Sequence, residues 1–325
     1  MRKNKNEELI EGYVFSSDLE LKVSGENSKN PGTKYISGNL NVATDEDGLN
    51  VIPVHYTYVT EFTKKTDEKG NPIKNRTWTA LTQIMEGAKE KHTWLDGGKD
   101  SAMKVRLLTS ADTSDYYRQS DDSMQTFQRN EGGFVNIVTD LSKGVRNRFT
   151  LDIMIIGVED VEADLERKVE EYAKIHAYIF NYKNDMQPFT LIAKSGPAIR
   201  YFLSLDASKR NPVYTQVAGT IENTTQVTKK TVESAFGEPS VDVTEKHIRE
   251  WVINWAKVEP YVIGLDDTIT ADEINEAMNN RELHLAEVKT RAKKFFESQE
   301  NAFANNIPVP TTETTASIPD GEFKF

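Results

Sequence analysis

The stretch Lys-Ile-His-Ala-Tyr-Ile-Phe-Asn-Tyr, residues 174–182, decides how we interpret the fold. In a β-strand, successive side chains point to opposite faces. One face would then carry Ile175, Ala177 and Ile179, and the other would carry His176, Tyr178, Phe180 and Tyr182, between Lys174 and Lys183. Such rings are either packed core or a platform for unpaired bases, each stacked base being worth about 1–3 kcal/mol. The strand by itself leaves both interpretations open.

The composition is that of an ordinary globular protein with room for two domains. Of the 325 residues, 37% are hydrophobic and 28% are charged. A net charge of -11 argues against a protein that coats duplex DNA by charge alone, because that task usually requires a basic excess. Single-strand binding stays open, since stacking shares the work and a basic groove can be local.

The sequence contains no cysteine, which excludes disulfides, thiol catalysis and cysteine-ligated zinc. Its polar start leads into no apolar signal core, and no later run approaches the roughly 18 apolar residues of a membrane helix. We therefore expect a soluble cytoplasmic protein.

The first half of the chain predicts a hairpin followed by a basic loop. Residues 35–43 and 51–62 alternate apolar and polar side chains around an acidic turn, with Tyr35 on the side that faces solvent or ligand. The loop 64–76 carries five cations against two carboxylates; the cations are Lys64, Lys65, Lys69, Lys74 and Arg76. Phe62 and Trp78 bracket this loop. It suits capture of a phosphate backbone, and it is equally typical of a solvated loop.

Further strands are expected at 12–23, 103–108 and 134–138, with a short helix at 79–91. The second half predicts strands at 149–158, 174–182, 189–193, 199–205 and 213–221, and a charged helix at 160–171. Residues 249–256 fit both helical and strand periodicity, and we favour a strand. Many short strands with Gly-bounded turns indicate antiparallel barrels rather than a βαβ sheet.

The C-terminal part predicts a long helix and a tail. Thr270-Ala-Asp-Glu273 has the form of a capping box, and an apolar face continues to about Glu297. Residues 301–325 are rich in Thr and Pro, which is typical of disorder. We thus expect a mainly β protein with added α, divided into a charged arm (1–10), two barrels (11–142 and 143–259), a helical segment (260–300) and a disordered tail (301–325).

Taken together, the hairpin, the basic loop, the aromatic strand and the tail tip resemble the single-stranded-DNA-binding proteins of bacteriophages and bacteria. That family is built on the OB-fold, a five-stranded Greek-key barrel. The resemblance implies tandem OB-fold-like barrels. Lys324 departs from the family's acidic tip, and the chain is much longer than a single-barrel bacterial protein, which suggests a phage-type protein with two barrels.

The resemblance also implies roles for individual residues. Bases would stack on the rings of Tyr35, Trp78, Tyr178, Phe180 and Tyr182, with His176 on the same face, and phosphates would contact Lys64, Lys65, Lys74, Arg76 and Lys183. The acidic-aromatic tip would bind replication or recombination proteins through Asp320, Glu322, Phe323 and Phe325. A tail that is merely solvated has the same composition.

We expect neither an enzyme nor a cofactor. The five histidines lack metal-ligand spacing, and the sequence has no phosphate-binding GxxxxGK[ST] loop, no GxGxxG after a strand and no GxSxG elbow. The favoured function is sequence-tolerant binding of single-stranded DNA in phage or mobile-element replication or recombination. The alternative is a phage structural or assembly protein whose aromatic strand and long helix form subunit contacts.

Overall fold

In the computed structural model, residues 4–26, 28–163, 170–181, 185–232, 240–265 and 268–304 are described. The chain divides into two compact units. The first comprises residues 1–114, 127–224 and 248–281, and the second comprises 115–126, 225–247 and 282–325. All of the strand registers given below lie in the first unit.

Eleven strands form one sheet, which closes on itself twice. The first closure, barrel 1, consists of β1 (Asn6–Ser17), β3 (Lys34–Ala43), β4 (Val51–Thr60), β7 (Lys104–Arg118) and β8 (Ser123–Val138). These strands neighbour one another in the order β1-β3-β4-β8-β7-β1. The β4–β8 pair is parallel, with Val54 opposite Asn130, and the β1–β3 and β3–β4 pairs are antiparallel. The short β2 (Glu20–Val23) extends the sheet beyond β3.

Barrel 2 repeats this order. Its strands are β9 (Asn147–Val161), β10 (Tyr172–Phe180), β11 (Met186–Ala193), β12 (Val213–Val232) and β13 (Ser240–Ala256). They run β9-β10-β11-β13-β12-β9, again with a parallel pair between the third and fifth strands. A closed order 1-2-3-5-4-1 is the Greek-key barrel of the OB-fold, so the predicted tandem OB-fold architecture is confirmed.

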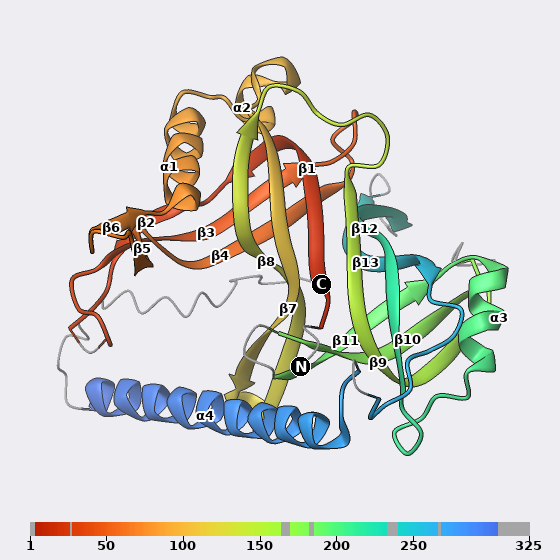
Figure 1. The fold of residues 1–325 in the computed structure, drawn as a ribbon. Coiled ribbons are helices and arrows are strands. Elements are labelled where there is room, and N and C mark those ends of the chain that lie inside the picture. The colour runs from red at the N-terminus through yellow and green to blue at the C-terminus, as the bar shows by residue number, and fades with distance from the viewer. Residues whose placement is uncertain are drawn as a thin grey trace. The chain divides into compact units, whose positions relative to one another are not determined.

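A helix occupies the same place in both barrels, between the third and fourth strands (Figure 1). In barrel 1 this is α1 (Arg76–Lys89), which buries Leu81 and Ile84 in the core. In barrel 2 it is α3 (Gly196–Ser204), which buries Ile199 and Phe202. Barrel 1 also has the short helices α2 (Trp94–Gly97) and η1 (Lys99–Ser101), and the short helix η2 (Gln119–Asp121) lies in the second unit.

The two barrels share one hydrophobic core. β1 pairs with β9 as well as with β3 and β7, and Asn6 lies opposite Leu151. Buried side chains of both barrels, among them Ile10 and Trp251, belong to one continuous cluster. This shared core spans the predicted boundary between residues 142 and 143. The structure therefore does not test that boundary, which stays a prediction.

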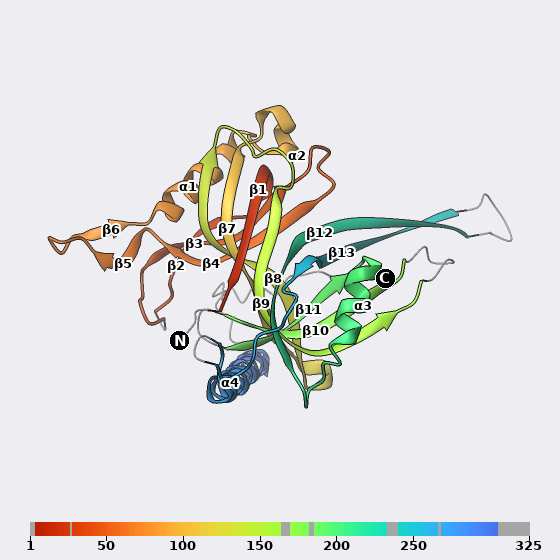
Figure 2. The same ribbon diagram turned by 45° about the vertical axis from the view of Figure 1, so that its right-hand side comes forward.

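Two predicted elements are wrong. Residues 199–205 belong to helix α3 and not to a strand: Ser195 caps the helix by accepting from the Ala198 amide, and Pro197 lies in the first turn. Residues 64–76 are not a loop either. β5 (Phe62–Thr66) and β6 (Pro72–Lys74) form a separate two-stranded hairpin, which Figure 2 shows standing away from the strands of barrel 1.

Other predicted elements are confirmed or altered in length. The hairpin of β3 and β4, the strand β10 and the strand at 249–256 are present. The predicted charged helix at 160–171 is replaced at its start by β9, which continues to Val161, and 164–169 lie outside the described residues. Helix α4 (Ala271–Ala304) begins at the predicted capping box, where Thr270 and Glu273 bond each other's amides at 2.9 and 3.2 Å. It extends into the predicted tail, of which 305–325 are not described.

Candidate nucleic-acid interface

An exposed pair of rings lies on the second and third strands of barrel 1. Tyr35 on β3 and Tyr58 on β4 have their ring centroids 4.5 Å apart with the planes tilted by 32°. Tyr58 is 46% exposed and Tyr35 is half-buried. The outer face of these two strands is where OB-folds bind oligonucleotides. The pair therefore presents aromatic surface at the position where a base would be expected to stack.

A β-bulge places Tyr58 on this face. Gly38 lies opposite Tyr56 and Ile36 lies opposite Val59, so β4 has one residue more than β3 over this interval. Tyr56 is fully buried, and plain alternation would bury Tyr58 as well. The extra residue changes the alternation and leaves both Thr57 and Tyr58 exposed. Alternation alone does not predict that Tyr58 is exposed; the glycine at position 38, which adopts φ 133°, is the signal of an irregular strand that the sequence contains.

The hairpin of β5 and β6 continues β4 and carries the predicted cations. Lys64, Lys65 and Lys74 are exposed, as is Arg76, the first residue of α1. Within the described part of the chain, none of these four cations forms an ion pair. Phe62, 48% exposed, pairs with Lys74 across the hairpin. The interface therefore combines exposed rings with positive charge that no carboxylate of the described residues pairs with.

The turn of this hairpin is built from one aspartate. The Asp67 carboxylate accepts from the Lys69 and Asn71 amides at 2.9 and 2.8 Å and from the Asn71 side chain at 3.1 Å. These bonds, chiefly those from Asn71, hold the pKa of Asp67 below its usual value. Asp67 is thus committed to the turn, and it leaves the lysines on both strands free to contact an anion.

A neutral imidazole lies on the same two strands. The Asp18 carboxylate accepts from Asn39 Nδ2 at 3.0 Å, so Asn39 Oδ1 faces His55 Nδ1 at 2.9 Å. An amide oxygen only accepts, which assigns the proton to Nδ1 and leaves Nε2 as an acceptor. Burial, followed by the charge of Arg129, lowers the pKa of His55 to about 4. His55 is therefore uncharged at neutral pH.

Arg129, by contrast, does not add free charge. Its Nη2 lies 3.2 Å from Asp112 Oδ2 and 3.0 Å from Glu131 Oε2. Burial raises the pKa of Glu131 against the lowering effect of Arg129. Two carboxylates thus surround one guanidinium, and the positive charge of the interface comes from the hairpin.

The corresponding face of barrel 2 is less suited to an anion. His176 on β10 is exposed and Tyr178 is half-buried, as the alternation predicts. However, Glu159 lies 3.4 Å from both Lys174 Nζ and His176 Nε2. Hydrogen bonds from His176 and Lys174 hold the pKa of Glu159 below its usual value, so the predicted cation beside the rings is already paired.

Phe180 does not share the open face. It is 3% exposed and packs with Met154, Met186 and Tyr214 in a second buried cluster. The expectation that it faces a ligand is wrong, because β10 ends where this cluster covers the strand. Trp78 lies on α1, half-buried against the core, and does not flank the hairpin as a free ring. The predicted residues Tyr182, Lys183, Asp320, Glu322, Phe323 and Phe325 lie outside the described residues.

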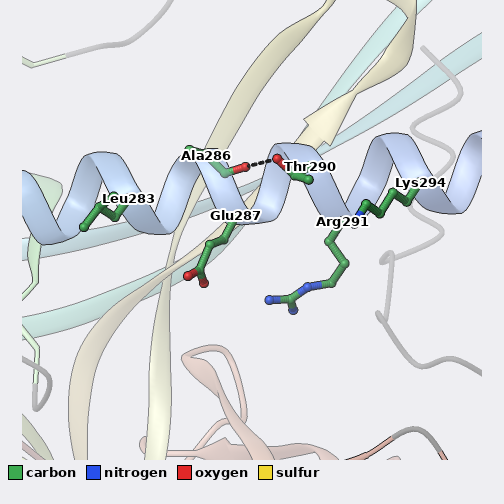
Figure 3. Close-up of a pocket in the computed structure, with 6 residues that line it drawn as sticks. All are labelled: Leu283, Ala286, Glu287, Thr290, Arg291 and Lys294. Atoms are coloured by element: carbon green, nitrogen blue, oxygen red, sulfur yellow. Dashed lines mark hydrogen bonds between the residues drawn. The ribbon is translucent and has the colours of Figure 1, made fainter.

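Helix α4 carries a shallow hollow of its own in the second unit. Figure 3 shows its six lining residues on one face of the helix: Leu283, Ala286, Glu287, Thr290, Arg291 and Lys294. The lining includes both signs of charge and no aromatic ring, so it offers no stacking surface. Among the described residues, no cluster of His, Asp and Glu has the geometry to hold a metal ion. No helix in the same residues is long and apolar enough to cross a membrane.

The YorF family model matches residues 5–291 of the chain. The chain belongs to the YorF family. A search of curated proteins finds no match. Among solved structures, this YorF-family chain is similar to the wild-type single-stranded DNA binding protein from Thermus aquaticus. That similarity has a TM-score of 0.44 and 9% identity, over 79% of this chain and 93% of that one.

A second similar structure is a Replication Protein A heterotrimer bound to single-stranded DNA. Its TM-score is 0.20 and its identity is 12%, over 76% of this chain and 49% of that one. Both TM-scores are below 0.5. The OB-fold assignment of the YorF-family chain therefore rests on its own strand order and registers.

Proposed function

We propose that this YorF-family chain binds single-stranded DNA across β3 and β4 of barrel 1, without strong sequence preference. The observation that carries the proposal is the exposed Tyr35–Tyr58 ring pair, followed along the chain by a hairpin whose lysines form no ion pair with the described residues. Every base has a π-face, so rings stack bases irrespective of sequence. The unpaired lysines supply the local positive charge that an acidic protein needs for a polyanion.

The finer parts of the proposal concern setting and partners. We place the protein in phage or mobile-element DNA replication or recombination, in the bacterial cytoplasm, as a binding protein without enzymatic activity. The tip with Asp320, Glu322, Phe323 and Phe325 would bind replication or recombination proteins. Support for this setting comes from the sequence resemblance and from the absence of cysteine, which fits a reducing compartment.

Fluorescence anisotropy with labelled oligo-dT and a duplex of equal length tests the proposal. We expect the single strand to bind, the duplex to bind more weakly, and the affinity to fall with salt. Tyr58→Ala should weaken oligo-dT binding by about 5- to 150-fold, the equivalent of one lost stack.

Tyr58→Phe is the matched control, because it retains the ring and removes only the hydroxyl that lies 3.2 Å from Ser24 Oγ. It should bind as the wild type does. A folded wild-type protein that leaves oligo-dT unshifted at low salt would contradict the proposed function and favour an assembly role. Unchanged affinity in folded Tyr58→Ala would exclude this ring pair as the platform.

A further inference from the structure

A second group of rings and cations lies at the end of barrel 1 where β3 ends and β7 begins. We call it the Tyr13 cradle; it consists of Tyr13, Phe15, Trp94, Lys99 and Arg146. Tyr13 and Phe15 come from β1, and Trp94 begins α2. The Tyr13 and Trp94 rings meet edge to face at 5.4 Å and 89°, and Phe15 lies 6.3 Å from Trp94. All three rings are half-buried and so retain exposed surface.

Two cations lie over these rings. Lys99 Nζ is 5.6 Å from the centroid of Tyr13 and 5.5 Å from that of Trp94. Arg146 Cζ is 5.9 Å from the centroid of Tyr13. A ring face bordered by cations is the arrangement that binds a base together with its phosphate. The cradle thus contains the same chemical components as the Tyr35–Tyr58 interface, at a separate place on barrel 1.

The Glu46 side chain occupies the two cations of the cradle. Its carboxylate lies 2.5 Å from Lys99 Nζ and also pairs with Arg146, while its carbonyl oxygen accepts from Lys99 at 2.7 Å. The Glu46 side chain is 54% exposed, whereas Lys99 and Arg146 are 32% and 13% exposed, so water reaches this contact from the side of the carboxylate. Hydrogen bonds from Lys99 and Arg146 hold the pKa of Glu46 below its usual value, which keeps it anionic. Exposed ion pairs are weak, and a competing polyanion can replace the carboxylate at small cost.

A hollow of about 530 Å³ adjoins the cradle. Lys143 and Arg146 line it from the connector between the barrels, and Glu46 lines it from the loop after β3. Arg146 Nη1 is buried and has no hydrogen-bond partner among the described residues, which leaves one strong donor unused. Asp45 also lines the hollow, but its carboxylate accepts from the Leu49 and Asn50 amides at 3.0 Å each, so Glu46 is the carboxylate that pairs with the cations of the cradle.

Asparagines fix the floor of this hollow against barrel 2. Asn147 Nδ2 donates to Thr44 Oγ1 at 3.1 Å, and Asn147 Oδ1 accepts from the Ile221 amide at 2.7 Å. Asn50 donates to the Ile221 carbonyl at 3.0 Å and accepts from the Asn223 amide at 2.8 Å. The loop that carries Glu46 is therefore anchored at its base to β12 of barrel 2, and Asn147, the first residue of β9, lines the hollow.

We propose that the Tyr13 cradle is a second contact for single-stranded nucleic acid and that the Glu46 carboxylate stands in for a backbone phosphate in the free protein. A strand long enough to leave the Tyr35–Tyr58 interface and reach the cradle displaces Glu46 from Lys99 and Arg146. This inference rests on the proposed function, since it assumes that the chain binds single strands. Glu46 thereby weakens the binding of oligonucleotides long enough to contact both places, and it has no effect on those that contact only the Tyr35–Tyr58 interface.

Glu46→Gln tests the inference, because it retains the shape of the side chain and removes its charge. Binding of oligo-dT of about 30 nucleotides should tighten by up to about fivefold, the factor that an exposed ion pair is worth. An oligonucleotide of about 8 nucleotides, near the size of one OB-fold site, should bind as to the wild type.

Two variants serve as controls. Glu90→Gln removes an exposed carboxylate at the C-terminal end of α1, 73% exposed against 54% for Glu46, and it should leave the binding of both oligonucleotides unchanged. Glu46→Gln combined with Lys99→Gln should lose the gain for the long strand. Lys99→Gln alone should weaken binding of the oligonucleotide of about 30 nucleotides and leave binding of the one of about 8 nucleotides unchanged. This provides a second readout if Glu46→Gln unfolds.

The outcomes separate the two proposals. If the wild type binds oligo-dT and Glu46→Gln has the same affinity for the oligonucleotide of about 30 nucleotides, Glu46 only holds its own loop in place. The cradle is then not a nucleic-acid contact. An equal gain for both lengths, or the same gain in Glu90→Gln, would mean a general effect of net charge and would also overturn the inference. If the wild type does not bind at all, the proposed function itself fails.

Discussion

One buried carboxylate stands out among the individual residues. Glu8 on β1 is fully buried, and it accepts from Trp251 Nε1 and Thr109 Oγ1, each at 2.9 Å. Burial raises the pKa of Glu8 to about 7, against the lowering effect of these two hydrogen bonds. Trp251 belongs to barrel 2 and Glu8 to barrel 1, so the protonation state of this carboxyl affects the seam between the barrels.

Glu8 makes stability depend on pH with a definite sign. Its pKa in the folded protein lies above that of an unfolded glutamate, so the folded state binds more protons between about pH 4.5 and 7. The contribution of Glu8 to stability is complete below about pH 4.5 and is lost as the pH rises through 7. We compare the free energy of unfolding of Glu8→Gln with that of the wild type at each pH. Relative to the wild type, the variant should gain about 2–3 kcal/mol between pH 5 and pH 8.

Urea unfolding of both proteins at pH 5 and pH 8 measures this difference. Glu7→Gln, on the exposed side of the same strand, is the control and should show no such change with pH. A difference between wild type and Glu8→Gln that stays constant from pH 5 to 8 would mean that Glu8 titrates normally in the fold.

At the scale of elements, local patterns predicted most strands, and long-range pairing decided the rest. Alternation placed β3, β4 and β10, and Thr270 with Glu273 placed the start of α4. The sequence could not predict that Val54 pairs with Asn130, or that the bulge beside Gly38 exposes Tyr58. These features depend on contacts between residues far apart in the chain or on one extra residue in a strand.

Two predictions, the strand at 199–205 and the ligand-facing Phe180, are wrong although the sequence contains local signals relevant to both. Ser195 and Pro197 indicate a helix start before α3, yet the apolar residues that follow are also compatible with a strand. Phe180 alternates with the exposed side chains of β10, and only the packing of Met154 and Tyr214 around it shows that the face closes there. Alternation identifies the two faces of a strand but does not show where another element covers one of them.

The hairpin of β5 and β6 is the element whose charge can be tested separately from the fold. All of its residues are exposed, so neutral substitutions there should leave the melting temperature nearly unchanged. Replacing Lys64, Lys65 and Lys74 by Gln should weaken oligo-dT binding and reduce the salt slope by about 2, at about 0.7 per lost phosphate contact. Anisotropy titrations at several salt concentrations measure the slope.

A matched triple variant of exposed lysines outside the hairpin controls for net charge. Lys89, Lys91 and Lys209 are exposed, and their replacement by Gln changes the total charge equally. Its slope should stay near that of the wild type. Equal losses in both triple variants would show that the hairpin acts only through the overall charge.

At the scale of the whole molecule, the shared core couples the two barrels of the first unit. β1 pairs with β9, Gln128 of β8 exchanges hydrogen bonds of 2.9 and 3.1 Å with the Thr190 backbone of β11, and Thr113 donates its amide to Gln187 at 3.0 Å. The β1–β9 ladder and these side-chain bonds to the backbone thus connect one barrel to the other. We therefore expect barrel 1 and barrel 2 to unfold as one cooperative unit.

A substitution deep in barrel 2 tests this cooperativity. A Cβ added at Gly219 would lie 1.9 Å from the Val252 carbonyl oxygen and 2.8 Å from Phe149 Cζ, so Gly219→Ala should destabilise the fold by about 1–3 kcal/mol. Gly157→Ala is the control, because a Cβ there meets no atom within 4 Å. Native-state hydrogen exchange should show β3 and β4 of barrel 1 losing the same free energy of protection as β10 and β11. A loss of exchange protection that is confined to barrel 2 would mean that the barrels open independently. Single-stranded DNA bound to barrel 1 would then stabilise that barrel alone.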